Sequence, residues 1–406
     1  MHASRLPPSA VPQYVGLAGL AGFAIALAII FQIAITPLLA VLITVALAGA
    51  PMWWLEWRRH RGIAYAQDER AASNKLPRKT RQEWRLRGLC TLALPWIFTL
   101  CTFQWLARWT IPGFWGALSL LWPALALSLL VYVLKPPPSA PMGAELVGRW
   151  WTHRQEGRFP WAALRDQLVK AYFLPLMVGS AFTLFQQAPL VFAQGRGLLW
   201  YLAPLALLYL VDVVFGVIGY ASTSRRLGAE IRSSNPFMLA WASAMVCYPP
   251  LVNWLAELRF QYNDGYEWFH WLGASGWRAW AWGTSILVLV AIYAWATVIF
   301  GIRFSNLTNR GIITNGPFRF TKHPAFISKN LSWWLVSVPF LSLSGTTQAA
   351  IHCIVLLAVN GIYYVRAKTE ERHLMQDATY RAYAEWIAVH GLFARLRLRR
   401  RTDARP

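Results

Sequence analysis

Long apolar runs separated by short basic segments dominate the pattern along this chain. A helix rises about 1.5 Å per residue, so about 20 apolar residues cross the roughly 30 Å hydrocarbon core of a bilayer. Eight runs before the C-terminal region fit this template: residues 14–34, 37–55, 89–107, 114–134, 171–187, 199–221, 237–254 and 279–300. Because a helix satisfies its own backbone hydrogen bonds, the pattern predicts a polytopic helical membrane protein.

Two further apolar stretches, residues 331–343 and 347–364, predict a helical hairpin that turns at Ser344 and Gly345. The first arm is short for a complete span and contains Pro339, so we expect it to be tilted, kinked or only partly inserted. The residues that follow, 365–386, predict an amphipathic cytoplasmic helix. The predicted fold is therefore all-α: about eight transmembrane helices, a C-terminal helical hairpin and this last helix.

Three regions are expected along the chain. Residues 1–300 form a transmembrane bundle. Residues 301–395 form a unit of different character, rich in polar motifs, and residues 396–406 form a basic tail. We see no repeat at a fixed period.

Charge fixes the expected orientation. Lys and Arg concentrate in residues 58–87, 135–170, 222–235 and the tail, and ten crossings place all of these segments on one side. The positive-inside rule then puts both termini in the cytoplasm, and we expect a cell (inner) membrane protein.

Composition agrees with a membrane protein and narrows the function. Hydrophobic residues make up 56% of the chain and charged residues 14%, which excludes a disordered chain, a disulfide scaffold and a fibrous repeat. The formal net charge of +22 would favour a nucleic-acid partner in a soluble protein, but no nucleic-acid motif is present, so none is expected. No metal site is predicted, because the four cysteines lie in apolar runs without metal-ligand spacing: Cys90, Cys101, Cys247 and Cys353.

The candidate chemistry lies near the C-terminus. Residues 305–330 mix Gly, Pro, Asn, Arg and His where a simple connection would be short, and Glu370 and Glu371 are adjacent where the chain leaves the membrane. Acidic side chains gain nothing from anionic lipid at this boundary. The pair therefore predicts a cationic partner.

Four motifs in this region occur in a recognisable order. They are Asn315-Gly316-Pro317, then Lys322-His323-Pro324-Ala325-Phe326, then the hairpin, then Arg366-Ala367-Lys368-Thr369-Glu370-Glu371 with Tyr380 and Tyr383 beyond it. This arrangement resembles the C-terminal signature of the isoprenylcysteine carboxyl methyltransferase family and related membrane methyltransferases. The family pattern is Arg-His-Pro-x-Tyr, so Lys322 replaces an Arg and Phe326 a Tyr, and Ser328 stands where Gly is common.

The resemblance implies a methyltransferase that uses S-adenosylmethionine, a sulfonium cation that carboxylates and an imidazole can hold. In that reading Glu370 and Glu371 bind the amino or ribose groups and His323 acts as a polar clamp. The implied cofactor-binding residues are Gly316, His323, Pro324, Phe326, Glu370 and Glu371. Pro324 fixes the turn that presents His323, Gly316 allows close backbone approach, and Phe326 covers the adenine.

The implied catalytic residues are Arg366 and His323. Arg366 either orients an anionic acceptor or pairs with Glu370 one helical turn later. The acceptor implied is a lipophilic molecule: a lipid, a lipidated peptide or a small thiol or carboxylate. The bundle of residues 1–300 is expected to hold this acceptor and to give it access from the bilayer. The oligomeric state stays open. Tyr380 and Tyr383 are expected to pack rather than to bind ligand.

Other functions stay open at this point. A membrane reductase of the sterol reductase type also has an Arg-His-Pro-x-Tyr stretch and uses a nicotinamide cofactor, and a transporter or scaffold is the alternative that is not an enzyme. Asp212, within an apolar run, is either functional or held by a buried hydroxyl, amide or Arg. Tyr248-Pro249-Pro250, near the end of the predicted helix over 237–254, is expected to kink that helix or to shape a substrate entrance.

Overall fold

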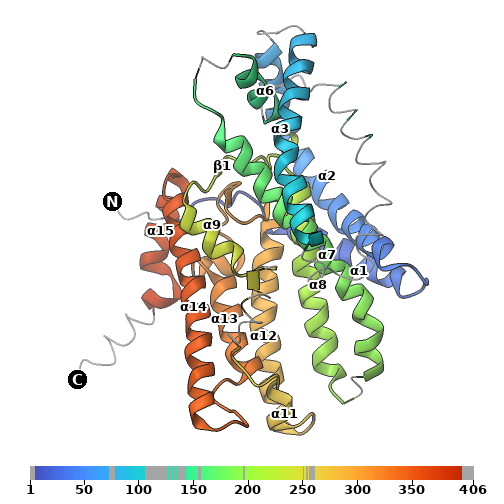
Figure 1. Ribbon diagram of the computed structural model, residues 1–406, viewed down its shortest axis with the longest axis vertical. Helices are drawn as coiled ribbons and strands as arrows, with labels where there is room; N and C mark the ends of the chain where they lie inside the picture. The colour runs from blue at the N-terminus through green and yellow to red at the C-terminus, as the bar shows by residue number, and fades with distance from the viewer. Residues whose placement is uncertain are drawn as a thin grey trace.

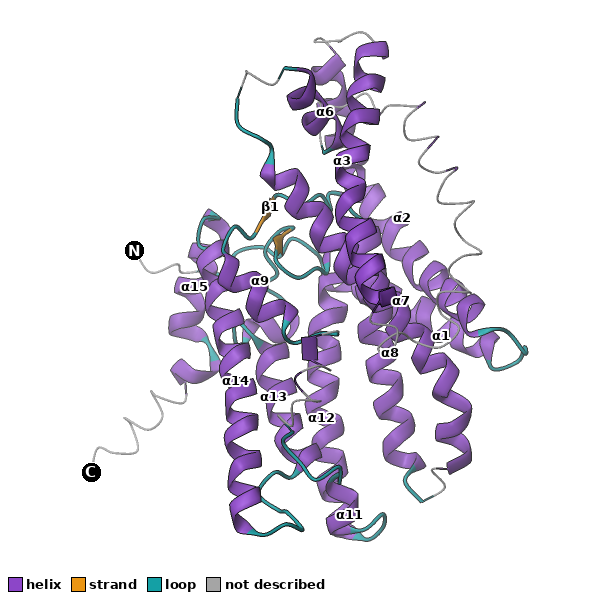
Figure 2. Cartoon of the chain, viewed as in Figure 1, coloured by secondary structure: helices purple, strands orange, loops and turns teal. Residues whose placement is uncertain are grey.

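The computed structural model (Figure 1) describes residues 5–72, 78–105, 143–153, 157–194, 197–249, 251–252 and 261–395, with a few isolated positions between them. Helices dominate these residues, as Figure 2 shows. The α-helices are α1 (Gln13–Ile30), α2 (Pro37–Ala72), α3 (Arg78–Trp105), α6 (Ala144–Thr152), α7 (Trp161–Gln194), α8 (Leu199–Ala221), α9 (Met238–Met245), α11 (Trp268–Leu272), α12 (Trp277–Phe300), α13 (Pro324–Ser337), α14 (Thr346–Leu374) and α15 (Ala378–His390). The strands β1 (Ser233–Ser234) and β2 (Thr308–Asn309) form a short antiparallel pair.

Six helices in this part of the chain are long and apolar enough to cross a membrane: Gln13–Ile30, Pro37–Gly62, Trp161–Pro189, Leu199–Ala221, Trp277–Arg303 and Thr346–Leu374. They confirm the predicted polytopic helical bundle. The predicted span 114–134 falls almost wholly outside the described residues. The predicted span 89–107 is the second half of α3, which starts in a basic segment and is not one of the six.

The predicted span 237–254 is wrong. The helix here, α9, has 8 residues and ends at Met245, and turns follow at 246–249. Pro249 and Pro250 have no backbone N–H for a helical ladder, which explains why an apolar run of this length does not stay helical. α9 instead packs beside α14.

The basic segment 58–87 is not the loop that we expected. α2 continues to Ala72 and α3 begins at Arg78, because Ala, Arg, Glu and Gln in this segment favour a helix. α3 and α6 project beyond the rest of the bundle (Figure 1). Glu145 of α6 joins them by accepting hydrogen bonds from Arg81 at 2.8 Å and Arg85 at 2.5 Å.

The C-terminal hairpin forms with different bounds. α13 starts at Pro324 and ends at Ser337, and Val338 then takes a left-handed conformation before Pro339. The amphipathic helix expected over 365–386 is two helices, because α14 runs on to Leu374 and α15 starts at Ala378. Asp377 separates them as the N-cap of α15, accepting a hydrogen bond from the Thr379 amide at 2.8 Å.

An N-terminal strap, residues 7–11, lies along the segment that leads to His323. The Ala10 amide donates to the Ile312 carbonyl at 2.9 Å. The Thr314 hydroxyl donates to the Pro7 carbonyl at 2.8 Å, and the Asn315 side chain donates to the Val11 carbonyl at 2.7 Å. The N-terminal strap and residues 312–315 therefore build one end of the bundle together.

Glycines bring α1 into contact with its neighbours. A Cβ at Gly16 would lie 2.2 Å from the Val298 carbonyl oxygen of α12, and a Cβ at Gly22 would lie 2.1 Å from the Leu47 carbonyl oxygen of α2. Small residues allow such backbone contact between membrane helices, where van der Waals packing takes the place of hydrophobic burial.

Asp212 is buried in α8 with hydroxyl partners. Thr297 of α12 donates to one carboxylate oxygen at 2.5 Å, and the Tyr293 hydroxyl donates to the other. The sequence left open whether Asp212 is functional or is held by a buried hydroxyl, amide or Arg. In the structure its partners are two hydroxyl groups. Tyr380 and Tyr383 are buried in the main core of the bundle, as expected for packing residues.

Candidate functional site

One buried arginine organises the loops behind the site. The Arg310 guanidinium donates to the carbonyls of Gly219 at 2.6 Å, Ser222 at 3.0 Å and Ala229 at 2.6 Å, so it caps the end of α8 and holds the loop that leads to β1. Burial lowers the pKa of Arg310 to about 9. β1 then pairs with β2, which brings Asn235 and residues 305–308 together.

His323 and Glu371, predicted as neighbours in one site, are in direct contact. His323 Nε2 lies 2.9 Å from Glu371 Oε1, and Lys322 Nζ lies 2.9 Å from Glu371 Oε2. Lys368 Nζ is 3.3 Å from the same Oε2. The Glu371 carboxylate therefore closes the turn before α13 onto α14, and it is engaged by this chain's own cations.

The turn at residues 322–323 leads directly into α13. Pro324 is the first residue of α13 and is buried, with His323 immediately before the helix. The His323 ring stacks on Phe326 at a centroid distance of 5.5 Å with parallel planes. Gly316 has φ of +55°, and a Cβ there would lie 2.8 Å from Ile299 of α12. Gly316 thus allows a close approach to α12, and it does not line the pocket described next.

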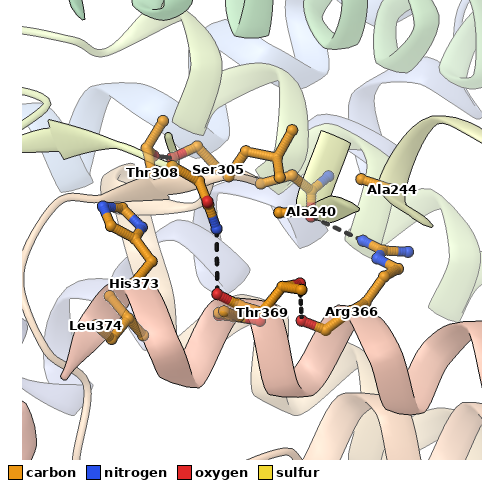
Figure 3. Close-up of a pocket in the computed structure, with 12 residues that line it drawn as sticks. Ala240, Ala244, Ser305, Thr308, Arg366, Thr369, His373 and Leu374 are labelled. Carbon is orange, nitrogen blue, oxygen red and sulfur yellow. Dashed lines mark hydrogen bonds between the residues drawn. The ribbon is translucent and has the colours of Figure 1, made fainter. Parts of the chain in front are cut away.

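A pocket lies between α14, α9 and the segment 305–308 (Figure 3). Its empty space is about 430 Å³, including the part open to solvent. The lining residues are Asn235, Ala240, Ala244, Ser305, Asn306, Leu307, Thr308, Arg366, Thr369, Glu370, His373 and Leu374. Alanines on the α9 wall leave this space, and α14 supplies most of the charged groups.

The polar face of α14 follows helical spacing. Arg366, Thr369, Glu370 and His373 fall at i, i+3, i+4 and i+7, so one side of the helix presents all four. Figure 3 shows Arg366, Thr369 and His373 on this helix. His373 Nε2 lies 2.9 Å from the Ser233 hydroxyl. Glu370 forms no ion pair with any described residue, which distinguishes it from Glu371.

Arg366 does not pair with Glu370, so that alternative is wrong. Its guanidinium lies over the rings of Tyr363, Phe326 and Tyr248, at 5.0, 5.2 and 5.6 Å from their centroids, and Nη2 donates to Asn306 Oδ1 at 3.3 Å. Cation–π contacts replace the carboxylate, because the side chain turns toward the aromatic interior rather than along α14.

Two pocket residues, Asn235 and His373, were not predicted from the sequence. Asn235 donates to the Thr369 carbonyl at 3.3 Å and accepts from the Phe237 amide at 3.0 Å, and no local motif marks it. His373 has a usable signal: it lies seven residues after Arg366, on the face that also carries Thr369 and Glu370.

Comparison with known proteins gives one match, and neither the curated proteins nor the solved structures contain a match to the chain. The matched region, residues 278–376, runs from α12 through the end of α14 and includes His323, Arg366, Glu370 and Glu371. It implies a membrane methyltransferase. Over this C-terminal region the chain matches the isoprenylcysteine carboxyl methyltransferase (ICMT) family.

Proposed function

We propose that this protein is a methyltransferase that binds S-adenosylmethionine in the pocket between α14, α9 and residues 305–308 and methylates a lipophilic acceptor. The observation that carries the proposal is the polar face of α14, which lines a pocket and lies within the region that matches the ICMT family. We further propose that residues 301–395 form the donor-binding unit and that the preceding helices give the acceptor access from the bilayer.

The residues of the pocket fit a cationic donor that also carries a carboxylate and hydroxyl groups. Glu370 offers a carboxylate without an ion-pair partner among the described residues, which suits an ammonium or ribose group. Arg366 likewise forms no ion pair with a carboxylate among the described residues. Its guanidinium therefore suits the carboxylate of the donor. Ser305 and Asn306 add hydroxyl and amide groups, and the alanines of α9 leave room beside them.

When bound, S-adenosylmethionine supplies a methyl group activated on a sulfonium. Such a transfer needs alignment and exclusion of water more than a proton relay. In this chain the Glu371 contacts with His323 and Lys322 fix the turn before α13 against α14. His323 and Glu371 are therefore positioning residues for the pocket wall, and Glu370 and Arg366 are the direct contacts that we assign to the donor.

The basic end of the bundle supports a cytoplasmic site. Arg303, at the end of α12, lies 3.4 Å from Glu56 of α2, just before the basic segment that begins at Arg58. The N-terminal strap lies at this same end. We propose, from the positive-inside rule, that this end faces the cytoplasm of a cell membrane.

Ligand stabilisation of the purified full-length protein tests the function. Donor-site binding predicts that S-adenosylhomocysteine raises the thermal unfolding midpoint and that NADPH does not. Glu370→Gln should weaken S-adenosylhomocysteine binding about tenfold, the effect of losing one charge-assisted hydrogen bond. Glu385→Gln, which removes an exposed acid from α15, is the matched control. Stabilisation by NADPH alone would favour a reductase, and stabilisation by neither ligand would favour a transporter or scaffold.

A further inference from the structure

The pocket described above has two chemically different ends. Arg366 and His373 are seven residues apart on α14, so about 10 Å of helix separates them at a rise of about 1.5 Å per residue. Figure 3 shows Arg366 at one end of the pocket, with His373 and Thr308 at the other. The Arg366 end is the one that we assign to the carboxylate of the donor. The His373 end lies beyond the groups assigned so far.

The imidazole of His373 is held from one side. His373 is 3% exposed, and its Nε2 atom lies 2.9 Å from the Ser233 hydroxyl of β1. Within the part of the chain that the structure describes, no hydrogen bond or ion pair engages the other ring nitrogen, Nδ1. Buried side-chain nitrogens normally have a hydrogen-bond partner. Because His373 lines the pocket, a ligand can supply the missing partner.

Two leucines add apolar walls to this end of the pocket. Leu374 follows His373 on α14, Leu307 precedes Thr308, and both leucines line the pocket. Leu307 has φ of +60°, a left-handed conformation that costs a leucine free energy. The Asn235 amide stabilises this conformation by donating to the Leu307 carbonyl at 2.7 Å, next to the β1–β2 pair. The fold therefore keeps a large apolar side chain at this wall in spite of the backbone cost.

Apolar walls with one buried polar nitrogen suit a flat heteroaromatic ring. Such a ring has apolar faces, which pack on aliphatic side chains, and nitrogen or oxygen atoms at its edge, which form directed hydrogen bonds. The donor of the proposed function carries one ring of this kind, the adenine.

We propose that His373, oriented by Ser233, binds the base of the donor and determines which base the site accepts. The inference rests on the proposed function, which places the amino-acid end of the donor at Arg366 and Glu370. The base then lies at the His373 end, between the two leucines. Its edge furthest from the ribose, with N1 and the amino group, faces Nδ1. Ser233 lies outside residues 278–376, so the family match does not assign this contact.

Adenine and hypoxanthine present opposite hydrogen-bonding groups at this edge. Adenine has an acceptor at N1 and a donor amino group, whereas hypoxanthine has a donor at N1 and an acceptor oxygen. A neutral imidazole whose Nε2 is committed to Ser233 has a single role at Nδ1, either donor or acceptor. Because Ser233 also fixes the position of the ring, hypoxanthine places the wrong group opposite His373. A site that leaves buried polar groups unpaired rejects such an analogue.

Ligand binding to the purified full-length protein tests the proposal. The probes are S-adenosylhomocysteine and S-inosylhomocysteine, which differ only in having adenine or hypoxanthine as the base. The dissociation constants are measured by isothermal titration or from the dependence of the unfolding midpoint on ligand concentration. The wild type should bind the adenine compound about tenfold more tightly or better. Equal affinities for the two compounds would overturn the proposal.

Variants assign the discrimination to the histidine. His373→Ala should bind S-adenosylhomocysteine about tenfold more weakly and should prefer it over S-inosylhomocysteine by no more than about threefold. Ser233→Ala should also reduce the preference, because the imidazole loses the partner that fixes it. His153→Ala removes an exposed histidine at the end of α6 and should keep the wild-type preference.

The preference for adenine separates recognition of the base from a structural role. A His373→Ala variant that binds both compounds more weakly but keeps the wild-type preference would overturn the assignment. If this variant does not fold, Ser233→Ala decides, and an unchanged preference there would overturn the assignment.

The same measurements separate this inference from the proposed function. Wild-type protein that binds S-adenosylhomocysteine and S-inosylhomocysteine equally well would contradict the role of His373 alone and would leave the methyltransferase function standing. Wild-type protein that binds neither compound would contradict the proposed function, and the selection of a base with it.

Discussion

His323 and Glu371 are 48 residues apart in the sequence, and the imidazole Nε2 lies 2.9 Å from the carboxylate Oε1. The contact joins the first turn of α13 to the last turns of α14 across the whole hairpin. It defines the end of the bundle at which the pocket lies.

A double-mutant cycle on this contact should show strong coupling. His323→Ala and Glu371→Gln are each expected to lower the free energy of unfolding, and the double variant should lose less than the sum, with a coupling energy of about 1–3 kcal/mol. The measurement is unfolding of the purified variants in detergent. Lys368, whose side chain is 52% exposed, gives the control pair with Glu371, and its coupling should be below about 1 kcal/mol. Additive effects of His323→Ala and Glu371→Gln would show that the contact does not hold the hairpin.

Arg310→Met should destabilise the loops behind the pocket. The substitution leaves the buried carbonyls of Ser222 and Ala229 without the guanidinium donor and leaves the Gly219 carbonyl with only the Ser222 amide, at an expected cost of about 3 kcal/mol or more. Arg310→Lys should recover only part of this, because an ammonium cannot reproduce the guanidinium fork. Thermal unfolding measures the loss. Arg319→Met, at an exposed position, is the control, and equal midpoints for the two Met variants would be incompatible with the structure.

Gly16→Ala should weaken the packing of α1 on α12. The added Cβ would lie 2.2 Å from the Val298 carbonyl oxygen, and relieving that overlap is expected to cost about 1–3 kcal/mol. Gly361→Ala in α14 is the matched control, because nothing lies within 4 Å of its added Cβ, and it should be neutral or stabilising by up to about 1 kcal/mol. Comparable stability of the two variants would argue against this helix contact.

Asp377 should make stability depend on pH in the acid range. Partial burial acts to raise its pKa, but hydrogen bonds from the Asn309 side chain and the Thr379 amide, with the charge of Arg232, hold the pKa below its usual value. A depressed carboxylate pKa stabilises the fold above the unfolded-state value and loses this contribution as pH falls through the folded-state value.

The variant Asp377→Asn isolates that contribution. Asn still caps α15, so the substitution removes the charge and keeps the cap. The wild type should be more stable by about 1 kcal/mol at neutral pH, and the difference should shrink below about pH 4. Unfolding midpoints of both proteins between pH 3 and pH 7 give the result. A difference that stays constant through this range would contradict the pKa direction.

The helical bundle was predictable because membrane-spanning helices appear in a sequence as long apolar runs. The proximity of His323 and Glu371 was also predictable, since motifs flanking a hairpin must return to the same end of it. Their direct contact was not, because both side chains were expected to bind the cofactor. The short helix α9 was not predictable. An apolar run does not reveal that the helix ends before Pro249 and Pro250, or that the alanines of α9 face α14. Periodicity likewise does not separate the two adjacent acids: Glu371 faces the turn before α13, and Glu370 faces the pocket.

The remaining pocket residues depend on contacts between distant segments. Asn235 reaches Thr369 across 134 residues, and this contact follows from the β1–β2 pair and from Arg310. Short strands of two residues and a single arginine bound to carbonyls have no sequence signature of their own. Helical spacing on α14 would nevertheless have added His373 to Arg366, Thr369 and Glu370.

The N-terminal strap sets an order of events during synthesis. Ser9 and Thr314 are in contact although 305 residues separate them. At a translation rate of about 5–20 residues per second, the ribosome reaches Thr314 about 15 s or more after Ser9. The strap therefore emerges long before its docking site exists, and the end of the bundle that holds His323 is completed only after the nascent chain has supplied its last helices.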